Sequence, residues 1–143
     1  MPKFSGLLNT INRSEIDAGQ LAKQTASTQE VRSFASRMVS EHQMMVQKID
    51  QLAQRLSVQP QKPALASTME NTHQETMEEL RTKSGSDFDK AYIAYQVKMH
   101  EQAVDFVNDV THSAENQSLK LHLRKARPDL QNHLTAAQSI EQQ

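Results

Sequence analysis

The 143-residue chain has the length of about one domain. Its 16 basic and 17 acidic residues leave a formal net charge of −1, which argues against a nucleic-acid-binding surface or a polybasic membrane anchor. Cysteine is absent, so disulfides, thiolate metal sites and cysteine nucleophiles are excluded. Tryptophan is also absent, aromatic residues make up 4% of the chain, and three glycines are too few for the many turns of a β-sandwich, so the composition favours an all-α protein.

Apolar residues recur at helical spacing in five stretches of the chain. The expected helices lie near residues 4–26, 29–57, 65–83, 87–112 and 117–141. Pro60 and Pro63 form the strongest break, because proline cannot occupy a helix interior without disrupting it. The last stretch keeps its register through Pro128, so we expect a kink there rather than a helix end. Short connections predict a single-domain, up-down antiparallel bundle over residues 1–143, with four long helices and a shorter third one.

Local signals mark three of the helix boundaries. Ser27 with Glu30 three residues later has the pattern of a capping box at the start of the second helix. Gly85 suits the position just after the end of the third helix. Ser86 with Asp89 then resembles a second capping box, at the start of the fourth helix.

Four titratable residues occupy the middle of the apolar stripes, where such side chains are uncommon. They are Glu15, His42, His100 and His133. At about 1.5 Å per residue, each lies roughly 16–24 Å from the start of its expected helix. Mid-helix residues of an antiparallel bundle meet at one level, so the sequence predicts a central cluster of one carboxylate and up to three imidazoles.

This predicted cluster has two interpretations. Imidazole and carboxylate ligands suit Zn, Fe, Ni or Cu(II), so the cluster would be a transition-metal site. A di-iron site of the ferritin type needs two Glu-x-x-His pairs, and the chain has only Glu70 with His73, which argues against that site. In the second interpretation each histidine is neutral and hydrogen-bonded across the bundle, with no metal.

Methionine accompanies histidine on two helix faces. The two sets are Met38, His42 and Met45, and Met69, His73 and Met77. Thioether with imidazole would suit Cu(I), whereas the alternative is that methionine fills irregular gaps in the core. The remaining histidines, His112 and His122, are expected at the surface.

Four ordered blocks resemble a bacterial family known as domain of unknown function 4142. The blocks are Phe4 with residues 15–22 (EIDAGQLA), residues 31–42 (VRSFASRMVSEH), residues 84–92 (SGSDFDKAY) followed by Val97 and His100, and Leu130, His133 and Leu134. The resemblance implies a ferritin-like bundle in a periplasmic or cell-envelope protein, without an established shared reaction. The start of the chain lacks the apolar stretch of an export signal, so we expect a cytoplasmic location if the chain is full length.

The chain contains no phosphate-binding loop, hydrolase nucleophile elbow or zinc-protease motif, and no apolar run of about 20 residues that could span a membrane. The first functional hypothesis is therefore a non-enzymatic helical protein of the envelope, associated with stress, that binds a protein partner or has a structural role. The alternative is a metal-binding protein that holds Zn, Fe or Cu at the Glu/His cluster. A metal-dependent oxidoreductase is a third hypothesis and requires open coordination positions.

Overall fold

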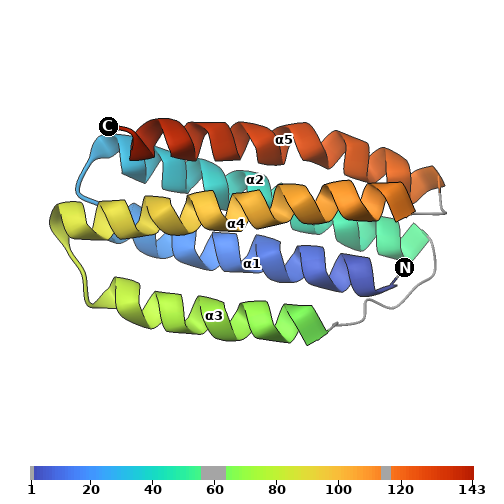
Figure 1. Ribbon diagram of the computed structural model, residues 1–143, viewed down its shortest axis with the longest axis horizontal. Coiled ribbons are helices and arrows are strands. Elements are labelled where there is room, and N and C mark those ends of the chain that lie inside the picture. Colours follow the sequence, from blue (N-terminus) through green and yellow to red (C-terminus); the bar gives the residue numbers. More distant parts are fainter. Residues whose placement is uncertain (1, 56–63, 114–116) are drawn as a thin grey trace.

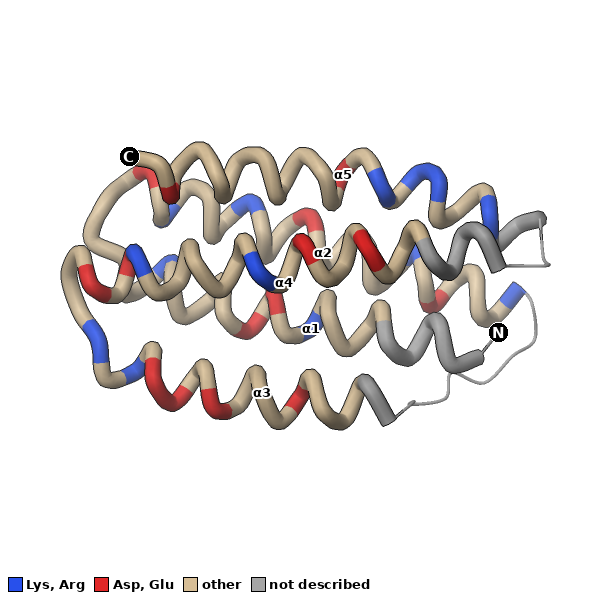
Figure 2. Tube along the Cα trace, viewed as in Figure 1, with Lys and Arg blue, Asp and Glu red and all other residues tan. Residues whose placement is uncertain are grey.

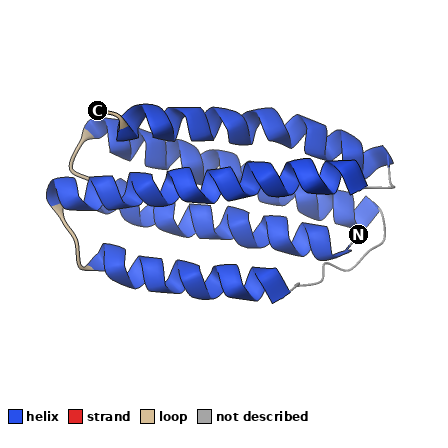
Figure 3. Cartoon of the chain, in the orientation of Figure 1, coloured by secondary structure: helices blue, strands red, loops and turns tan. Residues whose placement is uncertain are grey.

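The computed structural model is an antiparallel bundle of α-helices (Figure 1). The structure describes residues 2–55, 64–113 and 117–143, and side chains over residues 8–55, 66–108 and 120–143. The break expected at Pro60 and Pro63 lies outside the described residues, and the side chains of Phe4 and His112 lie outside the described side chains. Within the described ranges the regular elements are all helices (Figure 3).

The five helices of the described chain follow one another with a reversal of direction at each connection (Figure 1). They are α1 (Pro2–Thr25), α2 (Gln29–Arg55), α3 (Ala64–Arg81), α4 (Gly85–Ser113) and α5 (Gln117–Glu141). This arrangement confirms the predicted all-α, up-down bundle with a shorter third helix. The last helix continues through Pro128, in agreement with its unbroken apolar register, while the kink stays a prediction. None of these helices combines the length and apolar character that crossing a membrane requires.

Four of the helices form a central bundle, and the other one lies outside it. In that bundle α1 packs against α2 and α4, and α5 packs against the same two helices, while α3 contacts α1 and α4 (Figure 1). The sequence of α3 explains its position, because it buries few apolar side chains, among them Met77 and Leu80. A helix with so narrow an apolar stripe can cover one side of the bundle but cannot occupy its centre.

The contact between α1 and α2 is unusually close. A methyl group added at Gly19 would lie 2.8 Å from Cγ2 of Val39 and 3.1 Å from the carbonyl oxygen of Ala35. Ala18 and Ala22, on the neighbouring face of α1, are completely buried. These small residues let the two helix backbones approach each other, which brings the polar residues of α1 within reach of side chains on α2.

Asp89 ties the start of α4 to the turn between α1 and α2. Its Oδ1 accepts a hydrogen bond from the Ser27 amide at 2.8 Å, and its Oδ2 accepts from the Thr28 amide at 3.1 Å. Both hydroxyls donate to Oδ2 as well, at 2.9 Å from Ser27 and 3.2 Å from Thr28. The capping box predicted for Ser86 and Asp89 is therefore wrong: Asp89 is 7% exposed and faces a neighbouring turn.

Two other predicted helix ends also differ in the structure. Thr28 rather than Ser27 caps α2, since its hydroxyl accepts a hydrogen bond from the Val31 amide at 3.2 Å. Gly85 is the first residue of α4 instead of the residue that ends α3. It nevertheless has the left-handed backbone expected of it, with φ at 58°.

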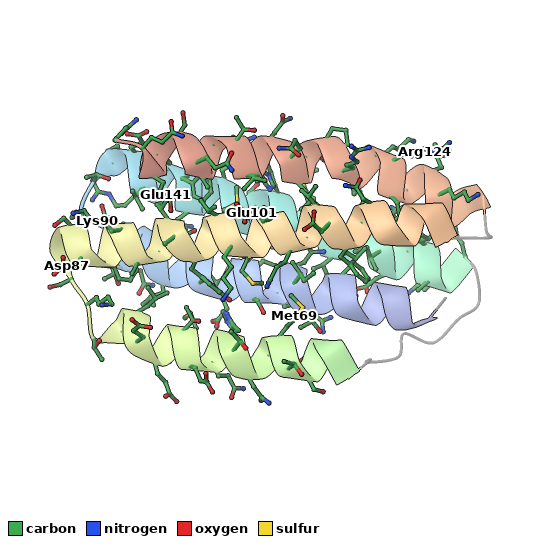
Figure 4. The ribbon with its side chains drawn as sticks, in the orientation of Figure 1. Met69, Asp87, Lys90, Glu101, Arg124 and Glu141 are labelled. Carbon is green, nitrogen blue, oxygen red and sulfur yellow. The ribbon has the colours of Figure 1, made fainter. Side chains whose placement is uncertain are left out.

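Replacement of Asp89 by alanine should destabilise the fold, because the backbone and hydroxyl donors of Ser27 and Thr28 lose their buried acceptor. A hydrogen bond to a charged group contributes about 1.5–3 kcal/mol, so we expect the free energy of unfolding to fall by about 3 kcal/mol in urea titrations. Asp87→Ala is the control, because Asp87 is exposed in the same first turn (Figure 4). Equal effects of the two substitutions would contradict the role assigned to Asp89.

Candidate metal centre

Three of the predicted residues meet in the core of the bundle. His42 from α2, His100 from α4 and His133 from α5 each offer one ring nitrogen, and these nitrogens lie within 4.8 Å of one another. The three residues are at most 1% exposed. Their ring centroids are 5.1–5.5 Å apart. We call these residues the histidine triad.

Two rings of the triad direct their Nε2 atoms at each other. His42 Nδ1 lies 2.7 Å from Oδ1 of Asn12, and His100 Nδ1 lies 2.8 Å from the carbonyl oxygen of Gln96. Because both partners are oxygen acceptors, each Nδ1 carries the proton and donates it, and each Nε2 keeps a lone pair. The two Nε2 atoms are 3.4 Å apart. Facing lone pairs at this distance repel each other unless a cation binds them both.

His133, the third member of the triad, also has an unprotonated nitrogen. Its Nε2 lies 2.5 Å from Oε2 of Glu41, so that nitrogen carries the proton and donates a hydrogen bond to the carboxylate. Its Nδ1 is buried and has no hydrogen-bond partner in the described part of the chain. The same Glu41 oxygen also pairs with Arg37, 3.0 Å away. A buried nitrogen without a partner needs an explanation, and a bound ligand is one.

Burial keeps the triad neutral. It lowers the pKa of His42 well below its ordinary value, and the neighbouring His100 and His133 lower it further. Burial also lowers the pKa of His100 to about 4, and it lowers that of His133 in spite of the hydrogen bond to a carboxylate. Neutral imidazole is the form that binds metals. Met38 and Met45, on the same face of α2 as His42, are part of the surrounding apolar core.

Glu15 does not join the triad, contrary to the expected four-residue cluster. Its carboxyl oxygens are not part of the group of converging ligand atoms, and Asn12 of the same helix is the residue that reaches His42. Asn12 precedes Glu15 by three residues, which is about 4.5 Å along the helix axis. Depth counted from expected helix ends cannot resolve a shift of one turn, and that shift separates the carboxyl group from the imidazoles.

Glu15 instead lies in a neighbouring group of buried polar atoms. Burial raises its pKa to about 8, and the adjacent Gln96 amide offsets only part of this effect. That amide is close to the carboxyl group, but neither Glu15 oxygen has a hydrogen bond of ordinary geometry among the described residues. The side-chain amide of Gln96 and the hydroxyl of Tyr92 have none either. A protonated Glu15 is therefore the stable form at neutral pH.

The second predicted methionine-histidine face does not present a free ligand nitrogen. His73 Nδ1 lies 2.5 Å from the Tyr95 hydroxyl, and its Nε2 lies 2.9 Å from Oδ2 of Asp17. Met77 is buried, and Met69 packs against the core (Figure 4). Because both ring nitrogens have hydrogen-bond partners, this face offers no unpaired histidine nitrogen for Cu(I) among the described residues. The same bonds attach α3 to α1 and α4.

His122 also departs from its expected place at the surface, because it is half-buried. Burial lowers its pKa, and the nearby Lys48, Arg55 and Lys125 lower it further. It lines a pocket between the helices.

Replacement of Glu15 by glutamine should stabilise the protein increasingly as pH rises. The folded chain retains a proton on Glu15 up to about pH 8, whereas the unfolded chain releases it near pH 4.5, so the stability from this proton is full below pH 4.5 and is lost as pH rises through 8. In urea titrations from pH 6.5 to 8, the stability of Glu15→Gln relative to wild type should rise by up to about 1.4 kcal/mol per pH unit.

Glu78→Gln is the control for this experiment, because Glu78 is exposed on α3. Its free energy of unfolding should change with pH in parallel with that of the wild type. A pH-independent difference between wild type and Glu15→Gln would contradict the protonated state assigned to Glu15.

Solved structures share this fold. CopM in its Cu(II)-bound form is 12% identical with a TM-score of 0.76, over 99% of this chain and 95% of that chain. CopM in its Ag-bound form is 14% identical with a TM-score of 0.77, over 97% and 93%. A Streptomyces coelicolor protein named as a DUF305 protein and a candidate for secretion is 10% identical with a TM-score of 0.81, over 96% and 89%. At these identities the likeness concerns the fold.

The sequence itself gives the family. No curated protein matches the chain. The sequence blocks that resemble a known family extend from the first helix to the last, and the family match has the same extent. Residues 2–140 match the family described as Domain of unknown function (DUF4142), and the chain therefore belongs to that family.

Proposed function

We propose that this protein binds one copper ion at His42, His100 and His133, and that it holds the ion as Cu(I). The observation that carries the proposal is the convergence of three buried, neutral imidazoles, each of which offers one ring nitrogen to a group of atoms that lie within 4.8 Å of one another. Each ring is oriented by an oxygen acceptor on its other nitrogen, which is the usual arrangement around metal-bound histidine.

The spacing of the nitrogens fits a metal ion. Two nitrogens bound to one tetrahedral ion at about 2.0–2.1 Å are about 3.4 Å apart. The Nε2 atoms of His42 and His100 have this separation. His133 offers a third ring nitrogen to the same group, and its Nδ1 lacks a partner among the described residues.

The chemistry of the ligands favours copper. Among the divalent ions of the first transition row, nitrogen ligands bind Cu(II) most tightly, and imidazole also suits Zn. CopM, a protein with the same fold, is named in Cu(II)-bound and Ag-bound forms. This likeness supports copper, although it transfers no ligand residues at such low identity.

The charge balance favours the monovalent ion. All three ligand atoms are neutral nitrogens, and the charged groups that act on His133 are Glu41, Arg37 and Asp129. Two carboxylates and one guanidinium carry a net charge of −1. A monovalent ion in the triad balances this charge, whereas a divalent ion leaves a buried positive charge without compensation, which is costly.

Burial of the triad indicates storage or transfer of the ion rather than catalysis. The three histidines are at most 1% exposed, so a substrate cannot reach an ion that they hold. We place this function in the cell envelope, which agrees with the candidate secreted protein among the structures of the same fold. A protein partner that delivers or accepts copper fits this role.

Copper titration of the metal-free protein tests the proposal. We expect the wild type to bind one equivalent of Cu(I) in anaerobic competition with a colorimetric Cu(I) chelator. His100→Gln and His133→Gln should weaken binding by more than the roughly 10–100-fold typical of losing an outer-shell partner. His73→Gln is the control, because His73 is a buried histidine outside the triad. Bound ion should also raise the unfolding temperature of the wild type.

Two results would contradict this proposal. Undiminished Cu(I) binding by both triad variants would place the metal elsewhere. Tighter binding of Zn(II) than of Cu(I), with Zn(II) binding weakened in the same two variants, would support a metal site at the triad but would contradict the choice of copper.

Glu41→Gln tests the outer shell of the site. The substitution removes the charge that holds His133, so we expect Cu(I) binding to weaken about 10–100-fold with little change in stability. Glu79→Gln is the matched control, since Glu79 also forms an ion pair with a residue four positions away, Lys83. The same affinity for Cu(I) in both variants would show that Glu41 does not contribute to metal binding.

A further inference from the structure

A pocket of about 340 Å³ lies between α1, α2, α4 and α5. This volume falls within the range of small-molecule sites, about 300–1,000 Å³. Its apolar wall includes Leu8, Ile11, Ile49, Ala103 and Leu130. All of these side chains are buried, so the wall is continuous with the core. At the rim is Leu121, a large apolar side chain that is 54% exposed.

The pocket is separate from the triad but adjacent to it. Met45, Ala103 and Leu130 line the pocket, and each lies three residues from one triad histidine on the same helix. The pocket is therefore about one helical turn from the imidazoles. Asn12, which accepts the hydrogen bond from His42, also lines the pocket.

The rim of the pocket is strongly basic. Lys48, Arg55 and Lys125 line it, and all three act on the half-buried His122 between them. Basic residues gather along the first half of α5 and at the end of α2 (Figure 2). Of the lining residues only Asp129 is acidic, which leaves a net charge of +2 with His122 neutral.

These cations have no ion-pair partner among the side chains that the structure describes. Among the described side chains, no ion pair or hydrogen bond neutralises Lys48, Arg55 or Lys125. Asp50, an acidic residue of the same stretch of α2, accepts a hydrogen bond from Asn9 at 2.9 Å. The pocket thus combines an apolar interior with an excess of positive charge at its opening.

We propose that this pocket binds an organic anion with an apolar body and a single acidic head, such as a carboxylic or sulfonic acid. The apolar body fills the interior, where burial of apolar surface is favourable, and the acidic head lies between Lys48, Arg55 and Lys125. A hydrated inorganic anion would leave the apolar wall unfilled. A neutral hydrocarbon would leave the cations without a partner. This site does not depend on copper in the triad.

Calorimetric titration of the metal-free full chain with decanoate, below its micelle-forming concentration, tests the proposal. We expect one molecule to bind, at least about tenfold more tightly than decanol, because decanol cannot form charge-assisted hydrogen bonds. Binding should weaken as salt is raised. A parallel titration with 1-naphthoate shows whether the pocket prefers an acid with an alkyl body or one with an aromatic body.

Paired variants locate the site. Ala126→Leu fills the pocket and should abolish decanoate binding, while Ala136→Leu, at a half-buried position of α5 outside the pocket, should not. Lys125→Gln should weaken binding about tenfold, while Lys98→Gln, on the exposed face of α4, should leave it unchanged. Lys125 is exposed, so its variant tests the site even if Ala126→Leu does not fold.

Three outcomes would overturn the proposal. They are equal affinities for decanoate and decanol, undiminished decanoate binding by folded Ala126→Leu, and equal effects of Lys125→Gln and Lys98→Gln. Titration of His100→Gln separates this site from the copper site: unchanged decanoate binding by a variant that has lost copper supports two independent sites. Loss of decanoate binding in that folded variant would contradict a pocket that is independent of the triad.

Discussion

The close packing of α1 against α2 is the constraint on which the rest of the structure depends. Gly19 has no side chain, and any Cβ there would overlap the Val39 side chain. The resulting approach of the two helices sets their axial position, and it lets Asn12 accept a hydrogen bond from His42. That bond determines which nitrogen of His42 is protonated, and hence that its lone pair faces His100.

The buried polar residues of the core form two neighbouring groups with opposite behaviour. In the triad, one nitrogen of each ring donates a hydrogen bond to an oxygen, so that the other nitrogen of that ring remains unprotonated. Beside it, Glu15 keeps its proton because burial disfavours the charged form. Gln96 connects the groups, since its backbone carbonyl accepts from His100 and its side chain lies next to Glu15. Both groups place unpaired polar atoms in an apolar core, which stability alone does not favour.

The two proposed sites use the same four helices at adjacent levels. The triad is buried and surrounded by core side chains, so it suits a small ion. One turn away, the packing between α2 and α5 leaves room for a larger ligand, and the basic residues of these helices surround its opening. The outer helix α3 contributes to neither site, because His73 uses both of its ring nitrogens to attach it to α1 and α4.

The helical stripes alone predicted the all-α bundle, because apolar spacing identifies the face of each helix that becomes buried. They also identified His42, His100 and His133 as core residues at similar depth. They did not identify Asn12, although it lies three residues before Glu15 on a buried face, nor the role of Glu41 beside His42. Periodicity gives the buried face but not the axial position of one helix relative to the next. Packing at Gly19 and the hydrogen bonds of Asp89 to the turn between α1 and α2 set that position. It decided that Asn12 rather than Glu15 reaches the triad. The pocket likewise exists only in the tertiary structure, because its wall combines side chains from four helices.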